Sequence, residues 1–279
     1  IAWTAGSGLA LSTALASNGE DEGIAPLTRA FSNMLETRVG HFATTRLALS
    51  ERTNLSFGMS HARNANVLGD YMSAPIAGIR LSAAAMRLDY AAPLSNFSLE
   101  MGSALEEGAV LGSTGTGALN LAERSASVWI RLGGDAQLGG NWSLKASTSF
   151  ALTNPDQKRG NLGANFTPII SSTASFGFVR NNLFSPGDAL SLTLHQPLRA
   201  ERAHITLFTA GIDPVTGAGA LQNSDISLTP SGREIAFELG YSGRIGVWVA
   251  QANIAFRHDA GHVAGEKSGA AMIWLSRWF

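Results

Sequence analysis

The sequence lacks cysteine, has few charged residues and contains no long apolar run. The absence of cysteine excludes a disulfide framework, thiolate metal ligands and a cysteine nucleophile. Only 15% of the residues are charged, whereas soluble domains usually have about a quarter. No stretch approaches the roughly 18 apolar residues that a transmembrane helix needs. The formal net charge of -1 provides no basic field, so we expect no nucleic-acid partner.

The sequence also lacks the motifs that organise common active sites. It has no G-x-S-x-G elbow and no P-loop, because the Gly-rich segment 112–117 is not followed by Lys-Ser or Lys-Thr. His258 and His262 lie near Asp259 and Glu266, but a His-x₃-His spacing brings two rings together only on a helix. They are weak metal candidates, and we expect no metal and no cofactor. No nucleophile–base–acid set is apparent, so no catalytic residue is predicted and the chain is not expected to be an enzyme.

Alternation with a period of two is the strongest pattern in the sequence. In residues 142–152, Trp142, Leu144 and Phe150 fall on one face of an extended chain, and Lys145 falls on the other. The same pattern returns in residues 55–60, 97–102, 190–195, 234–241 and 250–257. Segments of about ten residues match tilted membrane-spanning strands and exceed the five or six usual in soluble proteins. A soluble β-sandwich is the alternative, but polar faces with few lysines favour a membrane barrel.

Short and long connections alternate along the chain. The short turns lie at about 51–54, 92–96, 139–141 and 243–246, and the long connections at about 17–37, 64–78, 108–124, 153–172 and 259–269. Outer-membrane barrels have short periplasmic turns and long outer loops. The sequence thus predicts an all-β fold, a transmembrane antiparallel β-barrel of the bacterial outer membrane, formed by residues 1–279 as one domain and surrounded by outer-membrane lipid. Twelve strands are expected at about 2–16, 38–50, 54–63, 79–91, 97–107, 125–137, 142–153, 173–181, 188–198, 233–243, 247–258 and 270–279.

The segment of about residues 199–232 decides between twelve and fourteen strands. It contains two strand-like pieces, 203–210 and 224–229. If both crossed the membrane, the barrel would have fourteen strands, and residues 211–222 would form a long periplasmic turn. We therefore prefer twelve strands, with 199–232 as a long outer loop whose two pieces form a hairpin above the membrane.

The polar faces of the strands are expected to line the barrel lumen. By alternation, the charged and titratable lumen-facing residues are Glu100, Arg131, Lys145, His195, Glu234, Glu238 and Arg257. Charges in a narrow barrel must pair or stay hydrated. An internal network of ion pairs that stiffens the barrel is preferred over a conduction pathway, because a small barrel has little free interior.

Four short segments carry a further signal. They are Glu106–Gly117 (EEGAVLGSTGTG), Leu194–Arg199 (LHQPLR), Leu228–Glu234 (LTPSGRE) and Arg257–Ala264 (RHDAGHVA). In order and spacing they resemble the C-terminal region of subtilisin-like serine-protease autotransporters of alphaproteobacteria. In that family a C-terminal barrel anchors in the outer membrane and carries an N-terminal passenger outward.

The resemblance implies an outer-membrane translocator that anchors and exports a serine-protease passenger. The passenger would lie outside residues 1–279, and the passenger and the barrel-assembly machinery would be its partners. No signal peptide precedes Ile1, so we expect a mature form or a C-terminal piece of a longer chain. The membrane-insertion strand carries Trp274, Trp278 and Phe279, but Arg277 occupies the position where the family has an apolar or aromatic residue. The alternatives are a porin-like channel for small solutes, and a subunit or platform that binds another outer-membrane protein.

Overall fold

The computed structural model describes residues 1–7, 11, 15, 40–63, 80–111, 122–156, 163–212, 215 and 217–277. Nearly all the regular structure among these residues is β-strand. The strands are β1 (Ala2–Ser7), β2 (Gly40–Ala48), β3 (Thr53–Arg63), β4 (Arg80–Ala92), β5 (Ser95–Glu107), β6 (Arg124–Gly139), β7 (Trp142–Asp156), β8 (Gly163–Ala164), β9 (Ile169–Asn181), β10 (Ala189–Arg202), β11 (His204–Ile212), β12 (Gly219–Ser227), β13 (Ile235–Ile245), β14 (Trp248–His258) and β15 (Lys267–Arg277). One short 3-10 helix, η2 (Ala260–His262), lies between β14 and β15. Within the described residues, no helix is both long and apolar enough to cross a membrane.

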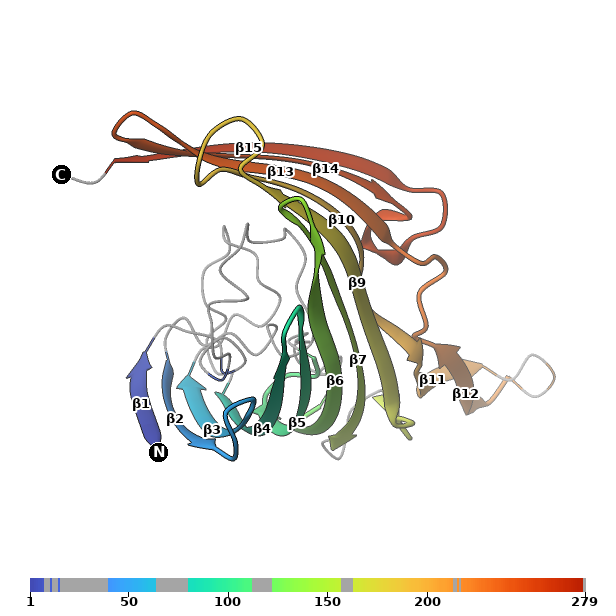
Figure 1. The fold of residues 1–279 in the computed structure, drawn as a ribbon. Coiled ribbons are helices and arrows are strands. Elements are labelled where there is room, and N and C mark those ends of the chain that lie inside the picture. Colours follow the sequence, from blue (N-terminus) through green and yellow to red (C-terminus); the bar gives the residue numbers. More distant parts are fainter. Residues whose placement is uncertain are drawn as a thin grey trace.

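Twelve of the strands form one antiparallel sheet that curls strongly around a concave face (Figure 1). The strands pair in chain order from β1 to β15, and β8, β11 and β12 are left out of this sheet. β11 pairs with β12 and β8 in a separate sheet of three strands. The prediction of twelve strands rather than fourteen is therefore confirmed for the main sheet.

The main sheet is open between its two edge strands. β1 pairs with β2, and β15 pairs with β14, but within the described part of the chain β1 and β15 do not pair with each other. In Figure 1 these two edges lie apart on opposite sides of the concavity. The strand order and the curvature are compatible with a β-barrel whose closing pair would be β1 and β15.

The short turns all lie at one end of the main sheet, which we call the short-turn end. They connect β2 to β3, β4 to β5, β6 to β7, β9 to β10 and β13 to β14. The remaining connections lie at the opposite, long-loop end. Because twelve strands alternate in direction, β1 begins and β15 ends at the short-turn end. This arrangement follows the alternation of connection lengths that the sequence predicts.

The strand predicted over residues 2–16 is too long. β1 ends at Ser7, and Leu11 and Leu15 are helical and buried. Four residues apart on a helix, these two leucines share one face, and that face packs on Gly58 of β3. A β-carbon at Gly58 would lie 2.9 Å from Leu11 Cδ1, so a larger residue there would displace the leucine.

The prediction that residues 199–232 form a single loop is also wrong in part. β10 continues to Arg202, because its pairing with β9 resumes at Arg199 after an irregularity. Pro197 lies in that irregularity and cannot donate to the strand ladder, which explains why the sequence suggested an end near this point. Beyond β10, the two predicted strand-like pieces form a hairpin, as β11 and β12.

The two faces of the main sheet are inverted relative to a soluble domain. Phe237 and Ile254, apolar residues of the alternating ranges 234–241 and 250–257, are 47% and 60% exposed. The concave face buries polar side chains instead, and Glu100 and Glu238 are only 2% and 8% exposed. Of seven apolar side chains on the face opposite to the predicted lumen residues, six are exposed, namely Trp142, Phe150, Phe237, Leu239, Ile254 and Phe256. The seventh, Leu144, is half-buried.

Candidate functional site

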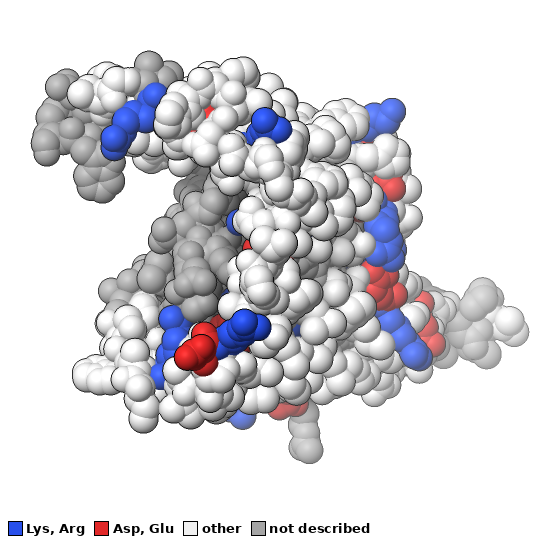
Figure 2. Space-filling model, viewed as in Figure 1, with Lys and Arg blue, Asp and Glu red and all other residues white. Residues whose placement is uncertain are grey.

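The outward face is a broad apolar surface with a girdle of aromatic side chains. Figure 2 shows one side of the molecule, on which charged side chains are sparse and wide areas carry none. Aromatic residues gather at the short-turn end, namely Trp3, Tyr90, Phe97, Trp142, Phe184, Tyr241 and Trp248. Phe184 packs edge-on against Tyr241, with the ring centroids 5.8 Å apart. Such girdles are typical of the membrane interface of β-barrels.

Trp274, the described aromatic residue of the predicted insertion strand, does not belong to this girdle. Trp274 pairs with Gln251 of β14 and therefore shares the concave side of the sheet with it. Trp278 and Phe279 lie outside the described residues.

A row of polar side chains crosses the concave face. Directly opposed residues of neighbouring strands share a face, and the register joins Ser56, Arg87, Glu100, Arg131 and Ser149 across β3, β4, β5, β6 and β7. Glu100 thus lies between two arginines, Arg87 and Arg131. Alternating signs reduce the cost of removing these charges from water.

Two hydrogen bonds anchor this polar row. Arg87 Nε donates to Asp89 Oδ1 at 2.7 Å, and the two side chains are only 4% and 12% exposed. Trp129 Nε1 donates to Glu100 Oε1 at 3.0 Å. The indole reaches Glu100 by lying over Gly102, where a β-carbon would come within 2.2 Å of the ring. The position of Glu100 therefore depends on Gly102, two residues away on the same face of β5.

Two residues of the connection between β1 and β2, Leu11 and Leu15, also lie against the concave face. Leu11 and Leu15 contact β3 at Gly58, and the side chain of Thr44 on β2 lies beside the same glycine. Arg46 Nη2 donates to the backbone oxygen of Leu15 at 3.3 Å. The concave side therefore holds a piece of chain in addition to the strands that form the sheet.

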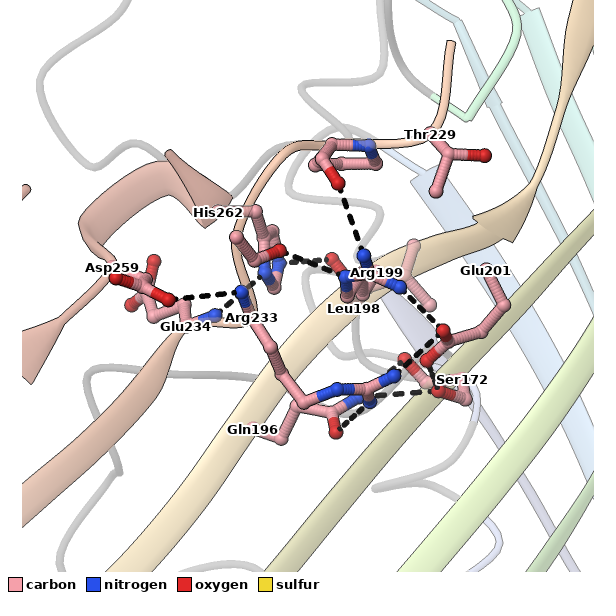
Figure 3. A network of polar contacts seen from close by, with 12 residues as sticks. Ser172, Gln196, Leu198, Arg199, Glu201, Thr229, Arg233, Glu234, Asp259 and His262 are labelled. Carbon is pink, nitrogen blue, oxygen red and sulfur yellow. Dashed lines mark hydrogen bonds and ion pairs between the residues drawn. The ribbon is translucent and has the colours of Figure 1, made fainter. Parts of the chain in front are cut away.

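At the long-loop end, a network of polar contacts ties the β12–β13 loop to the end of β10 (Figure 3). The Glu201 carboxylate accepts from Ser172 Oγ at 2.6 Å, from Arg199 at 2.5 Å and from Arg233 at 2.7 Å. Arg199 also donates to two backbone oxygens of the loop, at 2.9 and 3.0 Å. One carboxylate and two guanidinium groups thus fix this loop against the sheet.

The same network extends to the β14–β15 loop. Glu234 accepts two hydrogen bonds from Arg257, at 2.5 and 2.7 Å, and one from the Gly261 N–H at 2.6 Å. The Nδ1 atom of His262 accepts from the Glu234 N–H at 3.0 Å, while its Nε2 atom donates to the Leu198 oxygen at 2.8 Å. One ring nitrogen accepts and the other donates, so the ring is neutral.

Burial and neighbouring charges set the protonation of this network. Burial lowers the pKa of His262, and the nearby Arg199 and Arg233 lower it further, against the opposing influence of its hydrogen bond to Leu198 and of Glu234. Burial alone would raise the pKa of Glu234, but its hydrogen bonds and the arginine charge lower it. Glu234 is therefore ionised and His262 neutral near pH 7.

All seven residues assigned by alternation to the polar faces lie on the concave side or at its rim. Six of them fall in two groups, with Glu100 and Arg131 in the polar row, and His195, Glu234, Glu238 and Arg257 near the long-loop network. Lys145, on β7, is exposed. The geometry brings charged groups together in pairs and networks, and we find no arrangement of a nucleophile with a base among the residues that the structure describes.

Several members of these networks were missed from the sequence. Arg87 and Asp89 alternate with Met86, Leu88 and Tyr90, so the same period-two argument could have placed them on the polar face. Arg199, Glu201 and Arg233 could not have been found in this way. Their contacts join the end of β10 to a loop more than thirty residues later in the chain, as the separation of Arg233 and Gln196 by 37 positions illustrates.

The weak metal candidates have other partners. Both ring nitrogens of His262 are engaged in hydrogen bonds, and His258 Nδ1 lies 3.3 Å from Asp259 Oδ1. Within the described ranges, no group of three or more His, Asp or Glu side chains is arranged to hold a metal ion. His262 could act as a ligand only by giving up one of its hydrogen bonds.

No protein-family model, no curated protein and no solved structure matches this chain. Its function therefore has to be inferred from the fold and from the surfaces described above.

Proposed function

We propose that this chain is an outer-membrane β-barrel that serves as the translocator of an N-terminal passenger. The inverted faces of the sheet support the membrane location. In lipid, the outward apolar side chains contact acyl chains, and the polar side chains stay on the inside. The short-turn end with its aromatic girdle would then face the periplasm, and the long-loop end would face the cell exterior.

Closure of the sheet is part of this proposal. An unpaired strand edge in hydrocarbon leaves N–H and C=O groups without partners, at a cost of several kcal/mol each. β1 and β15 run in opposite directions, and β1 begins where β15 ends, at the short-turn end. Antiparallel pairing of these two strands would therefore close a barrel of twelve strands and turn the concave face into a lumen.

The observation that carries the transport role is the chain segment on the concave face. Leu11 and Leu15 pack against β3, and Arg46 binds the backbone of Leu15. The interior thus accommodates a segment in addition to the strands of the sheet, which a barrel that exports its own chain must do. A segment preceding β1 would enter the lumen from the short-turn end. About twelve strands leave room for an extended or helical segment but not for a folded domain, so export would precede passenger folding.

The transport role is tested by surface display of the passenger from the full-length gene. Removal of Trp274–Phe279 takes away the end of β15 that lies at the short-turn end, where β1 begins, and we expect the passenger to stay inside the cell. A matched deletion of residues 205–226 removes the β11–β12 hairpin, which lies outside the main sheet, and should leave display intact. Equal display with and without the last strand would refute the transport role.

A channel for small solutes is the second candidate, and the charged row on the concave face favours it. Glu100 and Arg131 are neighbours on β5 and β6, and both would line the lumen. If the barrel conducts, Glu100→Gln should shift the ion selectivity of single channels in planar bilayers towards anions. An unchanged selectivity would remove the support for this candidate. The projecting β11–β12 hairpin would suit the third role, that of a platform for another outer-membrane protein.

A further inference from the structure

An apolar groove lies on the outward face near the short-turn end. It has a volume of about 520 Å³ and is lined mainly by Leu138, Trp142, Phe178, Leu190, Leu192 and Leu239. The register places Phe178, Leu192 and Leu239 side by side on β9, β10 and β13. Sites for small ligands typically have about 300–1,000 Å³ and mostly apolar walls.

Arg180 lies at the rim of this groove. Its cross-strand neighbours are Trp142 on β7 and Leu190 on β10, so Arg180 shares the outward face with two residues that line the groove. The guanidinium carbon lies 5.2 Å from the centroid of the Trp142 ring. The Nε atom is buried and has no hydrogen-bond acceptor among the described residues.

The carboxylate of the neighbouring β9–β10 loop is already occupied. Asp188 accepts from the N–H groups of residues 183–185 at 2.6, 2.9 and 3.0 Å, and from the Tyr241 hydroxyl at 3.0 Å. These donors lower the pKa of Asp188 although burial alone would raise it. Arg180 is thus a cation on an apolar surface whose partner in the described structure is an aromatic ring. Such a cation calls for an external anion.

We propose that Arg180 and this groove form a binding site for one glycerophospholipid, with the phosphate on the guanidinium and an acyl chain in the groove. The inference rests on the membrane location proposed above and places the lipid in the periplasmic leaflet. A guanidinium matches phosphate oxygens through two parallel hydrogen bonds. The Trp142 ring holds the guanidinium at the level of the aromatic girdle, where lipid phosphates lie. From there the groove continues along Leu190 and Leu192 towards the middle of the membrane.

The combination of the two features separates a phospholipid from a free phosphate ion. A phosphate ion would use Arg180 alone and leave the apolar groove empty. A diacylglycerol would fill the groove but leave the guanidinium without an anion. Only a molecule with both parts satisfies the cation and covers the apolar walls.

The test is native mass spectrometry of the folded, detergent-solubilised protein during titration with palmitoyl-oleoyl phosphatidylethanolamine. We expect the first lipid molecule to bind each protein more tightly than the lipid molecules that follow it. Arg180→Gln removes a charge-assisted contact with phosphate and should lower the affinity for this lipid by about tenfold or more. Leu192→Trp fills the groove and should lower the affinity for the lipid independently. Because the two substitutions act on different parts of the site, a folding defect in one variant leaves the other informative.

Two matched variants serve as controls. Arg244→Gln removes an arginine near the same end of the sheet, but Arg244 pairs with Val249 and shares the concave side. Leu132→Trp enlarges an outward side chain of β6 that does not line the groove. Both controls should bind the lipid as the wild type does. Equal affinity of the wild type and Arg180→Gln would overturn the proposal, and so would inorganic phosphate that binds as tightly as the phospholipid.

Membrane insertion is measured separately, by carbonate extraction of the wild-type protein from liposomes. Failure to insert would refute the membrane location and with it the proposed function. Insertion together with unchanged lipid affinity in the Arg180→Gln and Leu192→Trp variants would overturn the lipid site alone.

Discussion

Single residues on the outward face report directly on the solvent that surrounds the sheet. For a leucine that is exposed in this structure, water and lipid predict quite different effects of replacement by a charged residue. If water surrounds it, replacement by a charged residue changes the free energy of unfolding by about 0.5 kcal/mol at most. If lipid surrounds it, the same replacement is expensive, and the cost depends on its depth in the membrane.

Leu239, near the middle of β13, is the most direct position for this comparison because it is 42% exposed on the outward face. We expect Leu239→Arg to destabilise the protein in liposomes by about 2–4 kcal/mol, as for arginine at the midplane of other barrels. Leu94→Arg is the depth control, since Leu94 lies in the β4–β5 turn and should cost about 0–1 kcal/mol. Equal, small effects of the two substitutions in urea titrations would contradict a membrane-embedded sheet.

His262 predicts a pH dependence of the long-loop network. Its pKa is lowered in the folded state, so the unfolded or detached loop binds the proton more readily. The contribution of His262 is therefore fully present above the unfolded pKa of about 6.5 and is lost as the pH falls below that value. Protonation of Nδ1 also removes the acceptor for the Glu234 N–H. The carboxylates of this network titrate only at lower pH, because the pKa values of Glu234 and Asp259 are lowered as well.

Hydrogen exchange measures this loss. We expect the amide of Glu234 to lose protection between pH 7.5 and 5.5 once intrinsic exchange rates are corrected for. In His262→Gln the side-chain amide cannot titrate, and the corrected protection should not change over this range. A similar pH dependence in both proteins would assign the effect to another group.

Among the elements, the strands with strict alternation were predicted best. β2 to β7 and β13 to β15 agree with their predicted ranges within three residues at each end, because apolar and polar side chains alternate along these strands and mark their two faces. The strand predicted over residues 2–16 failed because leucines at positions 11 and 15 suit both an extended and a helical periodicity. β8 has only two residues and depends on pairing with β11, more than forty positions away, which no local pattern reveals.

The β11–β12 hairpin is expected to project from the cell surface. Val215, between the two strands, is 91% exposed. We expect a site-specific protease, added to intact cells, to cut the chain when its recognition sequence is inserted after Val215. The matched insertion after Val247 lies in the β13–β14 turn, at the opposite end of the sheet, and should be cut only after lysis. The reverse pattern would invert the proposed orientation.

At the scale of the whole molecule, the open seam between β1 and β15 is the feature on which the proposed membrane location depends most directly. Among the described residues β15 is paired along one edge only, and Ile273 and Trp274 are 77% and 60% exposed although they point to opposite sides of the strand. Such an edge is tolerable in water but not in hydrocarbon. The sequence predicted the number of strands through local alternation. It could not predict how the seam is joined, because that depends on two ends of the chain that share no local pattern.

The absence of native cysteine permits a direct test of closure by disulfide trapping. Thr4 of β1 pairs with Thr44 and so shares the concave side, as Trp274 of β15 does through Gln251. We expect Thr4→Cys to form a disulfide with a cysteine at position 272, 274 or 276 in liposomes, since a bond requires β-carbons about 3.8 Å apart. The three positions cover a shift of register by two residues in either direction.

Two further pairs make this experiment decisive. Asn253→Cys with Met272→Cys joins register partners of β14 and β15 and should cross-link in any folded sample. Thr4→Cys with Ile273→Cys places the thiols on opposite faces and should not cross-link, because side chains on opposite faces of a sheet point away from each other. Cross-linking of the β14–β15 control without any β1–β15 bond would show that the sheet remains open in lipid. In that case a strand other than β1 would have to cover the edge of β15.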